Sequence, residues 1–151
     1  MIKIPASLLR QIYHHTEQCY PYECCGLLIG STDQDQNHTV HAFRQCRNLN
    51  TERARDRYLM DPVDYLRVTR EFENGPWDII GVYHSHPDHP SRASQTDTDR
   101  AIEIMATAWS YVIVSVQNGT VAGAQSWVLN ESEGKFYEEP LVTVPEEGES
   151  K

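Results

Sequence analysis

Two histidines separated by one residue are the clearest chemical signal in this sequence: His84 and His86, within the segment H-S-H-P. Side chains at i and i+2 of an extended segment point the same way, so both imidazoles can reach one ion. Asp97, eleven residues after His86, can supply a carboxylate once the chain turns back. Two imidazole nitrogens and one carboxylate are typical of a catalytic zinc site, because they leave the fourth tetrahedral position for water. The pattern therefore predicts a zinc site with hydrolytic chemistry.

Parts of this pattern also have alternative explanations. Ser94 and Asp97 fit a capping box, with a serine at the N-cap and an acid at N3, just before a segment of helical periodicity. A binuclear zinc site is a further alternative, because residues 84–89 fit the H-x-H-x-D-H pattern of the metallo-β-lactamase superfamily. That fold needs histidines far downstream, and none follows His89.

Hydrophobic periodicity predicts the elements that must position these residues. The predicted helices cover residues 7–18, 62–73 and 95–106, and the predicted strands cover 24–30, 39–46, 58–60, 79–83, 111–116, 120–129 and 136–144. Asp61 and Pro62 are a typical helix start, and Asn118-Gly119 favours a hairpin. The buried strand at 79–83 leads directly into the two histidines, so the core behind it would hold them in place. This order predicts a mixed sheet flanked by helices, of the α/β (α+β) class.

Length and charge limit the functions that this chain can have. Its 151 residues suit one domain, expected over 1–144, followed by an acidic tail at 145–151 that we expect to be disordered. The net charge of −9 argues against nonspecific binding to nucleic acid or anionic membranes. No apolar run is long enough for a membrane span or a signal peptide, so we expect a cytoplasmic protein.

The four cysteines, Cys19, Cys24, Cys25 and Cys46, do not form paired C-x-x-C motifs. The spacing therefore argues against a structural zinc. With no export signal in the sequence, we also expect no disulfides. We expect Cys24 and Cys25 to be small buried residues, with a reactive thiol beside the site as the alternative.

Seven of the thirteen basic residues lie between Arg44 and Arg70. They form either a solvated face or a binding surface for an acidic partner. Arg53, Arg55 and Arg57 alternate, so in an extended segment they would share one face.

Taken together, H-S-H-P, a spacer of seven residues and S-x-x-D resemble the JAMM (MPN+) metalloprotease motif, E…H-[ST]-H-x7-S-x-x-D. Glu23, just before an apolar, glycine-bearing strand, occupies the place of the family's upstream glutamate. The resemblance implies an MPN/JAB (cytidine deaminase-like) architecture and one zinc per chain, bound by His84, His86 and Asp97. It also implies that Glu23 is the general base and that Ser94 donates a hydrogen bond to the oxyanion.

Members of this family cut amide or isopeptide bonds at the C-terminus of ubiquitin-like proteins. This compact chain resembles the small stand-alone bacterial members more closely than the eukaryotic ones, including members similar to the CysO-cysteine peptidase, which release an amino acid from a ubiquitin-like sulfur-carrier protein. We therefore expect such a carrier as the substrate and partner, with Arg53, Arg55 and Arg57 as candidate residues for binding it. Two alternatives are a general isopeptidase of a bacterial ubiquitin-like conjugation system and a non-enzymatic MPN scaffold. The scaffold predicts a broken motif, and all five positions are intact.

Overall fold

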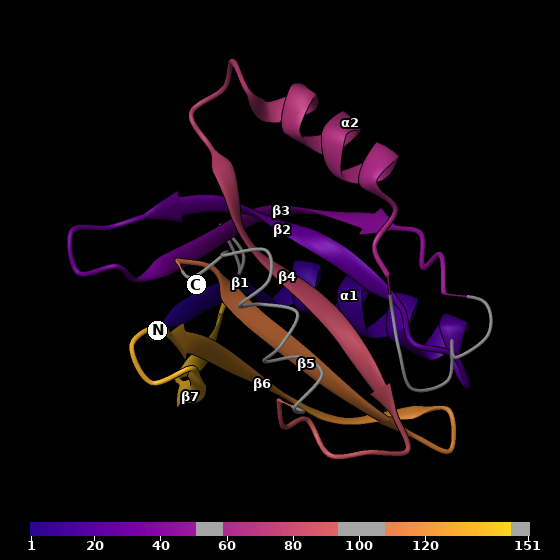
Figure 1. Cartoon of the computed structure of the whole chain (residues 1–151). Coiled ribbons are helices and arrows are strands. Elements are labelled where there is room, and N and C mark those ends of the chain that lie inside the picture. The colour runs from indigo at the N-terminus through magenta and orange to yellow at the C-terminus, as the bar shows by residue number, and fades with distance from the viewer. Residues whose placement is uncertain (51–58, 94–107, 146–151) are drawn as a thin grey trace.

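The computed structural model describes residues 1–50, 59–93 and 108–145, which form a mixed sheet and two helices (Figure 1). The sheet has eight strands in the order β7-β6-β5-β4-β2-β3-β1-β8. The elements are β1 (Ile2–Pro5), α1 (Ala6–Cys19), β2 (Cys25–Thr32), β3 (His38–Cys46), α2 (Pro62–Phe72), β4 (Asp78–Pro87), β5 (Ser110–Gln117), β6 (Thr120–Asn130), β7 (Lys135–Glu139) and β8 (Leu141–Val144). The predicted α+β class is confirmed.

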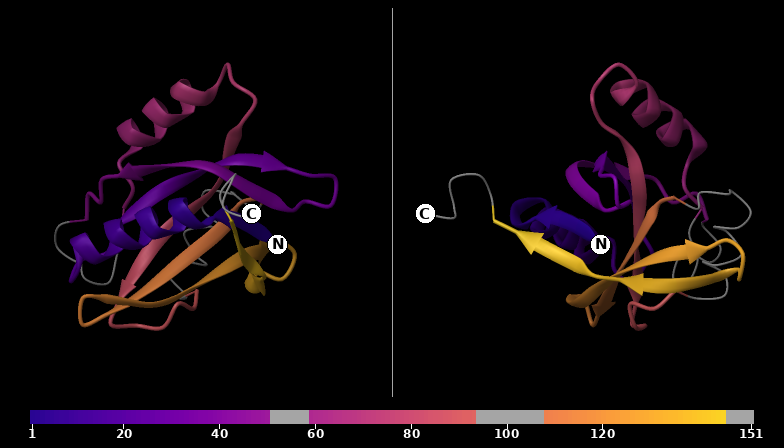
Figure 2. Two further views of the ribbon diagram at one scale, coloured as in Figure 1. Left: turned by 180° about the vertical axis from the view of Figure 1, so that it is seen from behind. Right: turned by 90° about the vertical axis from the view of Figure 1, so that its left-hand side faces the viewer.

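The two helices cover opposite faces of the central strands (Figure 2). Leu28 of β2 packs into the same cluster as Ile12 of α1, whereas its neighbours Leu27 and Ile29 pack with Val68 of α2. Successive side chains of a strand point to opposite faces, so a continuous apolar run such as β2 suits a strand that is covered on both sides. The site therefore forms on a sheet whose central strands have core packing on each face.

Both described helices begin where the sequence predicts. α1 follows Pro5, and α2 has Asp61 at its N-cap and Pro62 at its first position. The Asp61 carboxylate accepts a hydrogen bond of 2.9 Å from the Val63 amide. It thereby satisfies one of the amide groups that a helix start leaves without an intrahelical partner.

The prediction of one strand over residues 136–144 is wrong. The structure has two strands there, β7 and β8, separated by Pro140. β7 pairs with β6 at one edge of the sheet, and β8 pairs with β1 at the other edge. Proline has no N–H for a sheet ladder, while its carbonyl oxygen accepts a 2.9 Å hydrogen bond from the Ile2 amide. Because a single residue joins the two edges, the sheet must curl until they meet.

Three further predictions differ from the structure or lie outside it. β1 was not predicted, because its four residues are too few to show an alternating pattern. In place of the predicted strand at 58–60, Met60 forms an isolated antiparallel bridge with Asn48. The predicted helix at 95–106 and most of the acidic tail lie outside the described residues. Of the helices described, neither has the length and hydropathy needed to cross a membrane.

Candidate metal centre and active site

His84 and His86 lie at the end of β4, which extends through both of them to Pro87. β4 is an interior strand, paired with β2 on one side and with β5 on the other. The two histidines are almost fully buried, with exposed fractions of 1% and 7%. Their Nε2 atoms are 3.1 Å apart. The sheet therefore holds both rings with the same nitrogen directed to one point.

This separation fits two ligands of one zinc ion. With zinc–nitrogen distances of 2.0–2.1 Å, tetrahedral geometry places two such nitrogens roughly 3.3 Å apart. Nδ1 of His86 lies 2.8 Å from the Pro90 carbonyl oxygen, which can only accept a hydrogen bond. Nδ1 therefore carries the proton, and Nε2 of the neutral ring keeps its lone pair for a metal. A hydrogen bond of this kind to the non-ligating nitrogen is the usual support of a metal-bound histidine.

Ser85 fixes the segment before β2 against the two histidines. Its hydroxyl accepts a 3.0 Å hydrogen bond from the Cys24 amide, and its own amide donates to the Cys24 carbonyl at 3.1 Å. The next pair in the register is Cys25 with His84, and paired residues share a face of the sheet. Alternation continued from Cys25 to Glu23 puts Glu23 on the face of His84 and His86. The Glu23 side chain is buried, with 7% of its surface exposed.

The loop after β4 is also held in place by the rest of the sheet. The Asp88 carboxylate accepts hydrogen bonds from the Tyr20 hydroxyl at 2.7 Å and from the Asn118 amide at 3.0 Å. Further along, the indole N–H of Trp127 donates to the Ser91 carbonyl at 2.9 Å. The chain thus leaves the histidines along a path fixed by α1, the β5–β6 hairpin and β6.

A pocket of about 560 Å³ adjoins Glu23, is lined by residues of both α1 and α2, and includes the charged residues Arg47, Asp64 and Arg67. Asp64 accepts hydrogen bonds from the Arg47 amide at 2.8 Å and from the Arg67 guanidinium at 2.9 Å. The hydrogen bond from the Arg47 amide, followed by that from Arg67, holds the pKa of Asp64 below its ordinary value. Arg47 also forms an ion pair with Asp61.

Among the described residues, the basic stretch between Arg44 and Arg70 is therefore partly solvated and partly engaged in ion pairs. Arg44 forms an ion pair with Glu71, and Arg47 and Arg67 form ion pairs with aspartates of α2 or its cap. The Arg47 side chain nevertheless remains 71% exposed and lines the pocket beside Glu23.

The structure brings His84 and His86 together, and strand alternation continued from Cys25 assigns Glu23 to the same face. The other predicted site residues lie outside the described residues: Ser94, Asp97, Arg53, Arg55 and Arg57. His89, which a binuclear site would require, has an exposed side chain, and its carbonyl accepts a hydrogen bond from Ser115.

Two residues near the site were missed by sequence reasoning. Ser85 is part of the H-[ST]-H motif, but no role was predicted for it, because its bond to Cys24 joins positions 61 residues apart. Asn48 donates a 3.0 Å hydrogen bond to the Glu23 carbonyl from the end of β3. No local pattern in the sequence indicates that contact.

Comparisons with known proteins agree with this geometry. Residues 5–130 match the family described as prokaryotic homologs of the JAB domain. A desampylase from Haloferax volcanii is 36% identical over 81 residues, which is 54% of this chain and 55% of that protein. The chain therefore matches about half the length of this curated relative.

Two solved structures share the fold over nearly the whole chain. A Desulfitobacterium hafniense protein has a TM-score of 0.81 and 26% identity, covering 97% of this chain and 94% of that one. A Salinibacter ruber protein has a TM-score of 0.72 and 34% identity, covering 94% and 91%. The metallo-β-lactamase alternative for the H-x-H pattern is not supported by these matches. The chain belongs to the family of prokaryotic homologs of the JAB domain.

Proposed function

We propose that this protein is a zinc-dependent hydrolase that cleaves an amide bond at the C-terminus of a ubiquitin-like protein. The observation that carries the proposal is the approach of the His84 and His86 Nε2 atoms to 3.1 Å, with a buried glutamate on the same face of the sheet. The similarity to a desampylase supports it, since that name denotes an isopeptidase of ubiquitin-like modifier conjugates.

His84 and His86 would hold the zinc ion, with Asp97 as the third ligand. Zinc in such a three-ligand site lowers the pKa of a water molecule to about 7 and so supplies a nucleophile at neutral pH. The burial of both histidines keeps competing water away from their nitrogens and fixes their orientation through the sheet.

Glu23 would act as general base and then as general acid. Its carboxylate accepts the proton of the attacking water and returns it to the leaving amine. The two Cys24–Ser85 hydrogen bonds and the bond from Asn48 hold the backbone of the glutamate in place during both transfers. Ser94 would donate a hydrogen bond to the oxyanion that forms at the scissile carbonyl.

Within this reaction class, we propose a ubiquitin-like sulfur carrier as the substrate, from whose C-terminus the enzyme releases one amino acid. Such a tail must lie extended to reach a site at a strand end, and residues 47–57 would be its neighbours. A second candidate is an isopeptidase that removes a ubiquitin-like modifier from a lysine side chain. The desampylase similarity favours this second candidate.

One experiment separates the two substrates. The zinc-loaded protein is incubated with a sulfur carrier extended by a single amino acid, and separately with the same carrier joined to a lysine side chain. Intact-mass spectrometry then reports which bond is cut. Cleavage of the extended carrier alone supports the peptidase, and cleavage of the lysine conjugate alone supports the isopeptidase.

Glu23→Gln is the inactive counterpart in both assays, because an amide cannot take the proton from water. Glu73→Gln is the matched control, since it makes the same change at an exposed position at the end of α2. Cleavage should be lost in Glu23→Gln and kept in Glu73→Gln, with equal zinc content in both. If neither substrate is cut, or if Glu23→Gln stays within a few-fold of wild type, the proposed function is wrong.

A further inference from the structure

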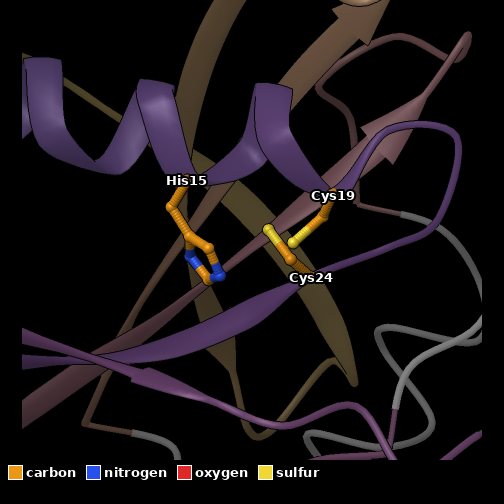
Figure 3. Close-up of side chains that lie close together, drawn as sticks. All are labelled: His15, Cys19 and Cys24. Carbon is orange, nitrogen blue, oxygen red and sulfur yellow. The ribbon is translucent and has the colours of Figure 1, made fainter.

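A second group of metal-ligating side chains lies on the other face of the sheet, beneath α1. It consists of His15, Cys19 and Cys24, and Figure 3 shows the imidazole and the two sulfurs directed toward one another. Their ligand atoms all lie within 4.8 Å of one another. His15 and Cys19 are at i and i+4 on α1, so they share one face of the helix, and Cys24 is the residue immediately before β2.

The His15 ring is oriented as a metal-binding histidine would be. Its Nδ1 atom lies 2.7 Å from the Tyr83 hydroxyl, and the other nitrogen, Nε2, is turned toward the sulfurs (Figure 3). A hydrogen bond at the non-ligating nitrogen fixes ring orientation in metal sites. Tyr83 itself has little freedom, because its ring lies over Gly26, where a Cβ atom would come within 2.4 Å of the hydroxyl oxygen. The glycine thus makes room for the residue that orients His15.

We propose that His15, Cys19 and Cys24 form a second metal site, for a thiophilic ion such as zinc(II). Two thiolates and one imidazole are the donor set that zinc(II) and copper(I) prefer. Tetrahedral zinc needs its nitrogen and sulfur ligands roughly 3.6–3.8 Å apart, so small side-chain rotations suffice. All three residues also line the 560 Å³ pocket, which gives an ion and a fourth, exchangeable ligand a path to the site.

The acid–base properties of the two thiols suit this role. A hydrogen bond from Cys24 and a second from His15 lower the pKa of Cys19. The same bond between the thiols, together with burial, raises the pKa of Cys24. Cys19 would therefore be the first sulfur ligand, and Cys24 would release its proton when the ion binds.

This site shares no residue with the one at His84 and His86. Cys24 and Tyr83 belong to the core cluster under α1, whereas Cys25, the partner of His84 in the register, belongs to the cluster under α2. An ion here would tie the end of α1 to the residue that follows Glu23. It would also raise the metal content above the single ion that the JAMM motif implies. The spacing H-x3-C-x4-C lacks a C-x-x-C pair, and for this reason no cysteine-bound metal was predicted from the sequence.

Cobalt(II) tests the site without reference to catalysis. Metal-free protein, fully reduced and kept from air, is titrated with cobalt(II), and the near-ultraviolet charge-transfer absorption of a cobalt–thiolate bond is recorded. The histidine–carboxylate set contains no sulfur, so this band reports the cysteine cluster alone. We expect the band in wild type and in a variant that lacks His84 and His86. We expect Cys19→Ser to abolish it, and to lower bound zinc by one ion per chain.

Cys46→Ser is the matched control, because Cys46 is also a free cysteine that lines the pocket but is not part of the cluster. It should keep the band. Tyr83→Phe removes the hydrogen bond to His15 and should weaken zinc binding by about 10–100-fold. Circular dichroism checks that each variant is folded. The absence of the band in reduced wild type, or its persistence in folded Cys19→Ser, would overturn the proposal. Neither result depends on whether a ubiquitin-like substrate is cleaved.

Discussion

Ser85, between the two histidines, is the residue that connects the metal centre with the glutamate. Its side chain and its amide both bond to Cys24, so the backbone of the adjacent Glu23 cannot shift along β4 without breaking one of two buried hydrogen bonds. His84 and His86 are directed to the other face by strand alternation and do not need these bonds. In the segment from His84 to His86, the two imidazoles can therefore bind the metal, while Ser85 fixes the position of Glu23.

Ser85→Ala should separate these two functions. The variant leaves the buried Cys24 amide without its acceptor, which costs about 1–3 kcal/mol of unfolding free energy. Misplacement of Glu23 should lower kcat by up to about 10²-fold, with zinc content unchanged. Ser85→Thr keeps the hydroxyl and is the control. Chemical denaturation and zinc analysis measure the two effects, and a fully active Ser85→Ala would show that this bond does not position the glutamate.

Ser94→Ala decides between the two explanations of the S-x-x-D segment. If the serine only caps a helix, its loss should cost roughly 1 kcal/mol of stability and leave the rate unchanged. If it donates to the oxyanion, kcat should fall by about 10²-fold or more with zinc retained. Thermal unfolding and steady-state kinetics on the same preparation distinguish these outcomes. We expect the large kinetic effect.

For single residues, the sequence predicted the contacts that depend on local spacing and missed those that depend on how distant segments come together. The pairing of His84 with His86 follows from an i, i+2 pattern in an extended segment, and the burial of Cys24 and Cys25 follows from an apolar run. Glu23 was identified only through the family resemblance. The hydrogen bond from the Cys24 amide to the Ser85 hydroxyl and the approach of His15 to Tyr83 join positions 61 and 68 residues apart, so no local pattern indicates them.

Among the elements, α2 is capped at its start by a residue, Asp61, that has two structural roles. Asp61 caps the helix as the sequence predicts, and its backbone amide also bonds to the Arg47 carbonyl at 3.0 Å. Through these contacts the helix start fixes the end of β3, next to the pocket beside Glu23. A local cap therefore also positions one wall of the candidate site.

Asp61→Ala should lower the unfolding free energy by about 1–2 kcal/mol through loss of the cap. Asp61→Asn keeps a capping oxygen and removes only the charge. Because Arg47 is mostly exposed, its ion pair contributes little, and the asparagine variant should stay within about 1 kcal/mol of wild type. Denaturant titrations of both variants provide the measurement. Equal losses in the two variants would mean that the ion pair, not the cap, stabilises this helix start.

In the part of the chain that the structure describes, helices and strands with strong periodicity were predicted within a few residues, whereas the pairing order of the strands was not predicted. The break at Pro140 illustrates the reason. A proline between two strand-like runs is compatible with a bulge, an edge strand or a change of sheet edge, and only the partners of each run decide among them. Here β6 and β1 are those partners, and they lie next to opposite ends of the strand order.

For the molecule as a whole, the meeting of the two sheet edges creates a buried polar cluster. Glu139, the last residue of β7, accepts hydrogen bonds from the hydroxyls of Ser110 at 2.6 Å and Ser126 at 2.7 Å. It also forms a 2.9 Å ion pair with the amino group of Met1. His38 bonds to the Ser110 hydroxyl at 2.7 Å. A buried carboxylate and a histidine that both bond to Ser110 therefore lie where the two edges of the sheet meet.

The pKa values of His38 and Glu139 are both lowered in the folded protein, so both groups make stability fall as the pH falls. Burial lowers the pKa of His38 below its ordinary value of 6.5. Burial alone would raise the pKa of Glu139, but the hydrogen bonds from Ser110, Ser126 and the Met1 amine outweigh it and place the pKa below 4.5. In both cases the unfolded chain binds protons more readily than the folded chain. The stabilising contribution of each group is therefore present above its unfolded pKa and is lost as the pH falls toward its folded value.

The free energy of unfolding should accordingly decrease on acidification in two stages, first below about pH 6.5 through His38 and then below about pH 4.5 through Glu139. Denaturant midpoints measured across this range test the prediction. His38→Asn, whose amide can still donate to Ser110, should flatten the first stage, and Glu139→Gln should flatten the second while lowering stability at neutral pH. Glu138→Gln changes the exposed neighbour and should leave the pH profile unaltered. A Glu139→Gln profile parallel to that of wild type would show that the protein closes its sheet without a charged carboxylate at this corner.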